Sequence, residues 1–191
     1  MKPNVEIITT EVLSDNWYTL NKVTYRQQLE DGRWLTQSRE AYDRGNGAAI
    51  LLYNPQQDSV VLTRQFRLPT YINGNADGML IEVCAGLLDG EQPEQAIKRE
   101  VEEETGYSLS QVKKVFELYM SPGSVTELVH FFVAHYSAED KTSEGGGTGE
   151  DERIEVLELS LNDALHMVND GRIKDGKTII LLQYLQLTQS K

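Results

Sequence analysis

The apolar pattern of the chain changes near residue 45, and this change constrains the fold most strongly. Before it, three segments alternate apolar and polar residues as strands do, and Asp31-Gly32 marks a hairpin turn between the last two. After it, the strand-like segments are shorter and more continuously apolar. The pattern predicts a small antiparallel β-sheet domain over 1–45 and a separate domain over 46–191. The expected early strands are 5–10, 17–25 and 33–42.

The second domain is expected to mix strands with two or three helices, which predicts the α+β class. Its clearest helix begins at Pro93 and ends near Gly106. A second helix follows the cap formed by Ser160 with Asp163. The last apolar run, 178–187, favours a helix, although its composition also suits a strand. The remaining expected elements are strands at 48–53, 59–66, 79–85, 112–119, 128–136 and 154–159 and a helix over 161–169.

The helix at 93–105 carries acids where packing calls for apolar side chains. At about 100° per residue, one face collects five residues. They are Ala96, Ile97, Glu100, Val101 and Glu104. A buried carboxylate is costly unless a cation compensates it, and a solvated acidic helix would place its acids on the opposite face. The spacing favours a Mg²⁺ site on two carboxylates, with Glu103 at its edge and Arg99 positioned to pair with Glu103.

The formal net charge is −12, and its distribution is uneven. Residues 89–104 hold seven acids and two bases (−5), and residues 139–158 hold eight acids and two bases (−6). Such blocks are usually solvated faces. An acidic chain repels a polyphosphate backbone, so nucleic acid is not an expected partner.

Three further features of the sequence indicate where in the cell the protein is expected. No apolar run reaches the length of a membrane span, and the first residues lack a secretory pattern. A single cysteine, Cys84, excludes an internal disulfide and suits a reducing compartment. We therefore expect a cytoplasmic protein with no membrane partner.

Residues Gly86, Glu91 and 99–107 together resemble the box of the Nudix hydrolase family. The half R-E-U-x-E-E-x-G-U, with U aliphatic or aromatic, is complete as REVEEETGY, matching seven specified positions over nine residues. One departure is that four residues rather than five separate Gly86 from Glu91. The resemblance implies a Nudix fold, a mixed sheet sandwiched by helices, following the N-terminal sheet.

The resemblance also implies a Mg²⁺-dependent hydrolase and assigns roles. Glu100, Glu104 and the Ala85 carbonyl would bind metal, and Arg99 and Glu103 would belong to the catalytic cluster. Glu152, after the glycine-rich stretch GGGTG, would serve as a metal ligand or general base on a loop hinged at those glycines. Three neighbouring acids compete for that role. They are Glu150, Asp151 and Glu155.

Within the family, the chain is similar to the branch of ADP-ribose and nucleotide-sugar pyrophosphatases. Pro122 lies 15 residues after Tyr107, and the likeness runs from about residue 12 to 185, through RQFR, AGLLD, ELYMSPGSVTELVHFF and EDERIEVLEL. It implies hydrolysis of GDP-mannose to GMP and mannose 1-phosphate, with ADP-ribose as the alternative substrate. A binding module would have lost the metal glutamates, and an mRNA-decapping enzyme would need a basic path for RNA.

The branch resemblance implies a set of substrate-binding residues and a dimer. An N-terminal sheet of three short strands is rarely stable alone, so a homodimer with exchanged N-terminal sheets is expected. Trp17 would reach into the partner subunit's site and stack on the base, although a core or interface role for this tryptophan is an equally good interpretation. Arg67 could equally be a surface arginine that packs beside Tyr71. The implied substrate residues are Trp17, Ser38, Arg39, Glu40, Arg67, Glu127, Asp151 and Lys177.

Overall fold

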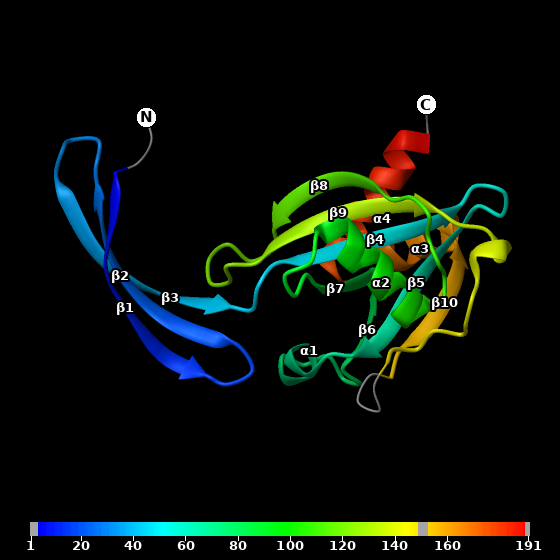
Figure 1. Ribbon diagram of the computed structural model, residues 1–191, viewed down its shortest axis with the longest axis horizontal. Helices are drawn as coiled ribbons and strands as arrows, with labels where there is room; N and C mark the ends of the chain where they lie inside the picture. Colours follow the sequence, from blue (N-terminus) through cyan, green and yellow to red (C-terminus); the bar gives the residue numbers. More distant parts are fainter. Residues whose placement is uncertain (1–3, 149–152, 190–191) are drawn as a thin grey trace. The chain divides into compact units, whose positions relative to one another are not determined.

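The computed structural model describes residues 4–148 and 153–189. The chain divides into two compact units, each with its own sheet (Figure 1). The first contains the residues up to Asn46 together with Tyr119–Leu128, and the second contains Gly47–Leu118 and the residues from Val129 onward. The sequence assigned 119–128 to the second domain, but hydrogen bonds attach this segment to the first: the Tyr42 N–H donates to the Ser124 carbonyl at 2.8 Å.

The first unit is the antiparallel sheet that the alternating pattern predicts. Its strands pair in the order β1-β2-β3. Gly32, in the turn between the last two strands, has φ +84°, which glycine adopts without strain. The strands are β1 (Val5–Asp15), β2 (Thr19–Gln28) and β3 (Trp34–Asp43).

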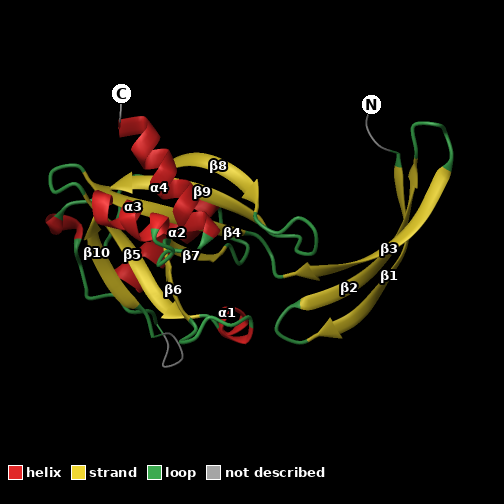
Figure 2. Ribbon diagram, turned by 180° about the vertical axis from the view of Figure 1, so that it is seen from behind, coloured by secondary structure: helices red, strands yellow, loops and turns green. Residues whose placement is uncertain are grey.

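The second unit, as far as it is described, is built on a seven-stranded mixed sheet (Figure 2). The main path is β10-β5-β4-β9-β8, in which β4 runs parallel to β9. The expected strand over 79–85 is two strands, because β6 pairs with β5 whereas β7 pairs with β4. The strands are β4 (Gly47–Asn54), β5 (Ser59–Phe66), β6 (Met79–Glu82), β7 (Cys84–Leu87), β8 (Lys113–Tyr119), β9 (Leu128–His135) and β10 (Glu155–Ser160).

The three expected helices are present at the predicted positions, and the part of the chain that the structure describes contains two further short helical elements. The final apolar run is a helix, because Leu181, Leu182 and Leu185 share one buried face at helical spacing. The sequence did not indicate α1 or η1. The helices are α1 (Leu68–Ile72), α2 (Pro93–Thr105), η1 (Ala138–Asp140), α3 (Leu161–Asn169) and α4 (Gly176–Gln189).

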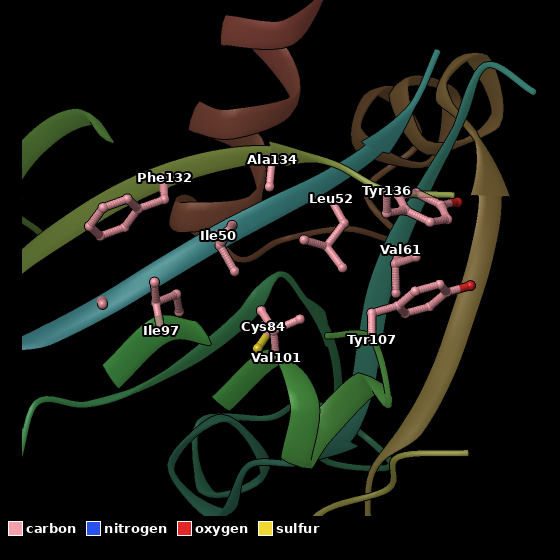
Figure 3. Close-up of a cluster of buried hydrophobic side chains, with 11 residues drawn as sticks. Ile50, Leu52, Val61, Cys84, Ile97, Val101, Tyr107, Phe132, Ala134 and Tyr136 are labelled. Atoms are coloured by element: carbon pink, nitrogen blue, oxygen red, sulfur yellow. The ribbon is translucent and has the colours of Figure 1, made fainter. Parts of the chain in front are cut away.

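The core of the second unit lies between the sheet and α2. Ile50 and Leu52 of β4 pack in one cluster with Ile97 and Val101 of α2 (Figure 3). The opposite face of β4 meets α4, where the Tyr53 hydroxyl donates to Gln189 at 2.8 Å. Both faces of β4 are thus buried, and the expected α+β class with helices on a mixed sheet is confirmed. Among the described helices, none combines the length and apolar character needed to cross a membrane.

Candidate active site

The helix α2 presents its two glutamates as the sequence predicts. Pro93 begins the helix, and Gly106 ends it in the left-handed conformation (φ +75°). Ala96, Ile97 and Val101 are buried on the sheet side. On that face, Glu104 is only 5% exposed, and the side chain of Glu100, one turn earlier, is 16% exposed.

The Glu104 carboxylate is buried without full compensation. Its Oε2 has no hydrogen-bond partner among the residues that the structure describes. The pKa of Glu104 is raised to about 8: burial is the main cause and the nearby charge of Glu100 adds to it, while a hydrogen bond from the Cys84 thiol opposes the rise. An orphaned carboxylate oxygen of this kind is the environment that a bound cation would stabilise.

The strand β7 lies close against this carboxylate pair. A Cβ at Gly86 would lie 2.2 Å from the carboxyl carbon of Glu100, so any larger residue there would displace the Glu100 side chain from its position. The backbone of Ala85 hydrogen-bonds to Glu104. The structure therefore brings together the three predicted metal-binding residues, Ala85, Glu100 and Glu104, from β7 and α2.

Arg99 holds the acidic cluster together. Its Nη1 lies 3.0 Å from Glu100 Oε1 and 3.0 Å from Glu103 Oε2, and its Nε donates to Glu91 at 3.2 Å. Burial lowers the pKa of Arg99, but these three carboxylates outweigh that effect and raise it. The expected Arg99–Glu103 pair is confirmed, and the shortened box loop still delivers Glu91 to the arginine.

The glycine-rich segment packs on the end of α2. The N–H groups of Gly146 and Gly147 donate to the carbonyls of Glu104 and Glu103 at 2.9 and 3.1 Å. A Cβ on Gly145 would lie 2.5 Å from the Glu104 carbonyl oxygen. The sequence suggested a hinge here, whereas Gly145–147 form a close-packed connection that satisfies the final carbonyls of the helix.

Two predicted substrate residues join an ion-pair network around the buried carboxylates of Glu82 and Asp175. Arg67 Nε donates to Glu82 Oε2 at 2.6 Å, and Lys177 Nζ donates to Glu82 Oε1 at 3.2 Å and to Asp175 Oδ1 at 2.7 Å. Burial lowers the pKa of Lys177, but the charges of Asp175 and Glu82 outweigh it, so the pKa is raised. Sequence reasoning missed Glu82 and Asp175, although an acid inside the apolar run MLIEVCA was a usable signal.

Five predicted substrate residues lie in the first unit. Trp17 is 85% exposed, the Ser38 hydroxyl bonds to Thr24 at 2.9 Å, and Glu127 lies 3.5 Å from Arg44 Nε. Arg39 and Glu40 follow Ser38 on exposed positions of β3. Asp151 and Glu152 lie outside the described residues. The substrate roles of the five residues and of Asp151, and the catalytic and metal-binding role of Glu152, stay predictions.

The oxygen donors at this site bear on metal binding by the described residues. They contain no group of three His, Cys, Asp or Glu side chains that could hold a metal. Two carboxylates and a carbonyl nonetheless suit a hard divalent ion, which takes oxygen ligands and keeps water and substrate phosphates as the others. The oxygen donor set and the orphaned Glu104 Oε2 therefore fit such an ion.

Two family models match the chain in adjacent segments. The model of the NUDIX domain matches residues 43–181, and a model described as the GDP-mannose pyrophosphatase NudK N-terminal domain matches residues 4–42. The chain belongs to the Nudix family, which confirms the resemblance read from its box.

Individual relatives match nearly the whole chain. A protein of Yersinia pestis named GDP-mannose pyrophosphatase is 59% identical over 187 residues, covering 98% of this chain and 94% of the relative. Proteins of the same name from Klebsiella pneumoniae and Salmonella arizonae are 56% and 55% identical, covering 97% and 98% of this chain and 93% and 98% of theirs. A crystal structure of an ADP compounds hydrolase has the same fold, with a TM-score of 0.74, 20% identity, and coverage of 100% of this chain and 95% of its own.

Proposed function

We propose that this chain is a Mg²⁺-dependent nucleotide-sugar pyrophosphatase that hydrolyses GDP-mannose to GMP and mannose 1-phosphate. Relatives that are 55–59% identical over nearly its full length carry the name GDP-mannose pyrophosphatase. The observation that carries the proposal is the buried, incompletely partnered Glu104 beside Glu100 on the helix of the Nudix box.

The residues that would hold the ion are Glu100, Glu104 and the Ala85 carbonyl. When bound, Mg²⁺ would neutralise charge on the pyrophosphate oxygens and lower the pKa of a coordinated water molecule. Hydrolysis adds water across the P–O–P bridge, so that one phosphorus gains the water oxygen and the other keeps the bridging oxygen. No covalent bond to the protein is needed, and positioning with charge stabilisation carries the rate.

The side chains of the protein are proposed to position the metal ligands, bind the phosphate groups and accept a proton. Arg99 fixes the carboxylates of Glu100 and Glu103 through its hydrogen bonds and ion pairs. Arg67 and Lys177 supply positive charge for the phosphate groups of the substrate. Glu152 stays the predicted base that accepts the proton of the attacking water, with Asp151 beside it as a predicted substrate contact.

A comparison of substrates tests this proposal. We expect kcat/KM for GDP-mannose to exceed that for GDP-glucose and ADP-ribose by at least about tenfold, because contacts to the base and sugar each discriminate by a few kcal/mol. Initial rates with Mg²⁺ across the three compounds measure it. Faster hydrolysis of ADP-ribose would replace the proposed substrate while keeping the reaction, and no hydrolysis of any of the three compounds would contradict the proposed function.

We further propose that the protein is a homodimer that exchanges its N-terminal sheets and works in the cytoplasm. The three-stranded sheet exposes a set of large apolar side chains, which favours a covering partner. They are Val5, Ile7, Ile8, Val12, Leu13, Trp34 and Leu35. Trp17, Ser38, Arg39, Glu40 and Glu127 are then available to substrate in the dimer. Sedimentation at micromolar concentration is expected to give twice the 21.6 kDa chain mass, and a monomer would rule the exchange out.

The buried free thiol Cys84 suits a reducing compartment, which supports the cytoplasm as the location, and cell fractionation tests this.

A further inference from the structure

The network around Glu82 joins two distant parts of the second unit. Glu82 ends β6 and is 3% exposed, and its two oxygens accept hydrogen bonds from Arg67 and Lys177, one each. On the other side of Lys177, Asp175 Oδ2 accepts from the backbone N–H and hydroxyl of Thr178 at 2.9 and 2.7 Å. The chain of bonds therefore runs from the end of β5 through β6 to the beginning of α4.

Two further hydrogen bonds fix the backbone at and beside Glu82. The Val83 N–H donates to Thr178 Oγ1 at 2.8 Å, and the Thr63 hydroxyl donates to the Glu82 carbonyl at 3.3 Å. Val83 directly precedes β7, which carries Ala85. The backbone around Glu82 is thus held by β5 and α4, directly before the strand that contributes to the metal centre.

A network of this composition is poorly explained by stability alone. Two carboxylates and two cations are charge-neutral together, yet apolar residues of similar volume usually stabilise a core at least as well as a buried ion pair. Glu82 and Asp175 have side chains only 4% and 9% exposed, so both are desolvated at a cost. A function for the fixed charges accounts better for their presence in the network.

The two cations keep donors that the network does not use. Arg67 bonds to Glu82 through Nε, and within the described part of the chain neither Nη makes a hydrogen bond, while its side chain stays 39% exposed. Lys177 bonds to two carboxylates, and an ammonium group has three N–H donors. Glu82, which holds both cations, lies three residues before Ala85, so the network adjoins the strand of the predicted metal centre.

We propose that Glu82 is a positioning residue, which holds Arg67 and Lys177 in one fixed arrangement so that their unused N–H groups bind the oxygens of the pyrophosphate. This inference rests on the proposed function. Without Glu82, the two cations repel each other, and Arg67 is free to leave the substrate position. With Glu82, the ordering of two long side chains is completed before substrate binds, which lowers the entropy cost of binding.

The test replaces the carboxylate by an amide of the same shape. In Glu82→Gln, the amide oxygen accepts a hydrogen bond from one of the two cations, while the amide N–H group faces the other cation. We expect KM for GDP-mannose to rise about 10- to 100-fold, as expected for losing a hydrogen bond to a charged group, with kcat changed less than about threefold. The matched control is Glu94→Gln, which neutralises an exposed carboxylate paired with Lys98 at 2.8 Å and should leave KM unchanged.

A double-substitution experiment separates positioning from support of the fold. In a chain that already carries Arg67→Ala and Lys177→Ala, Glu82→Gln should cause no further rise in KM, because Glu82 acts through those two cations. An equal rise in both backgrounds would overturn the proposal, as would a fall in kcat that follows a lowered unfolding midpoint. If Glu82→Gln fails to fold, Glu82→Asp keeps the charge with a shorter reach and is expected to raise KM in the same direction.

Binding of inorganic pyrophosphate in EDTA gives a readout that needs no hydrolysis. Calorimetry should show a dissociation constant about tenfold higher for Glu82→Gln than for the unmodified protein and for Glu94→Gln. Equal constants would overturn the role of Glu82 even if GDP-mannose is hydrolysed. Conversely, weaker pyrophosphate binding in a protein that does not hydrolyse GDP-mannose would support Glu82 and contradict the proposed substrate.

Discussion

Replacement of Glu100 by glutamine is expected to lower kcat for GDP-mannose by at least about 100-fold, because one charged oxygen ligand of the proposed Mg²⁺ site is lost. Its carboxyl group packs against Gly86 and lies 3.0 Å from Arg99 Nη1, and glutamine has nearly the same shape. The fold should therefore persist. Steady-state kinetics with saturating Mg²⁺, together with the unfolding midpoint, measures both properties.

The same helix offers a matched control for this substitution. Glu102 lies two residues further on and faces solvent, so Glu102→Gln removes the same charge from α2 without touching the carboxylate pair. We expect its kcat to stay within about twofold of the unmodified enzyme. Unaltered turnover in Glu100→Gln, or equal losses in both variants, would contradict the placement of the metal centre.

In the metal-free protein, the free energy of unfolding is expected to fall as the pH rises from about 4.5 to about 8. Burial raises the pKa of Glu104 to about 8, whereas the unfolded chain has the ordinary value of 4.5. The folded protein thus holds a proton that the unfolded chain has lost. This stabilisation is complete below the unfolded pKa and disappears as the pH passes the folded pKa, with an upper bound of about 5 kcal/mol.

Urea unfolding in EDTA at pH 5 and pH 8 measures this effect. Glu104→Gln cannot titrate, so its difference between the two pH values should be smaller by several kcal/mol, whereas Glu102→Gln should behave like the unmodified protein. Added Mg²⁺ should restore stability at pH 8 in the unmodified protein, because an ion that binds only the folded state stabilises it. An equal pH dependence in Glu104→Gln would show that another group is responsible.

Local sequence patterns correctly predicted the helix of the Nudix box and the face that carries its glutamates. The helix over 93–105 was predictable to the residue, because Pro93 and Gly106 bound it and its buried face repeats at helical spacing. The same periodicity placed Glu100 and Glu104 on the packing face. The run 79–85 was misread as one strand, because its break at Val83 comes from a change of partner strand, from β5 to β4.

Long-range contacts explain most of what the sequence did not predict. Glu82 and Lys177 are 95 residues apart, and no local pattern indicates that they meet. The glycines at 145–147 are typical of flexible loops by composition alone. Their close approach to the last turn of α2 follows only from the fold, since it depends on where the chain returns after β9.

Product analysis of GDP-mannose hydrolysis tests the central claim most directly. Incubation with Mg²⁺, followed by separation and ³¹P NMR of the products, should give GMP and mannose 1-phosphate in equal amounts. Neither product should form in EDTA, and Glu100→Gln should form both at least about 100-fold more slowly. Release of GDP and free mannose would mean that the glycosidic bond is cleaved rather than the pyrophosphate bond. That result, or equal product formation by Glu100→Gln, would contradict the account.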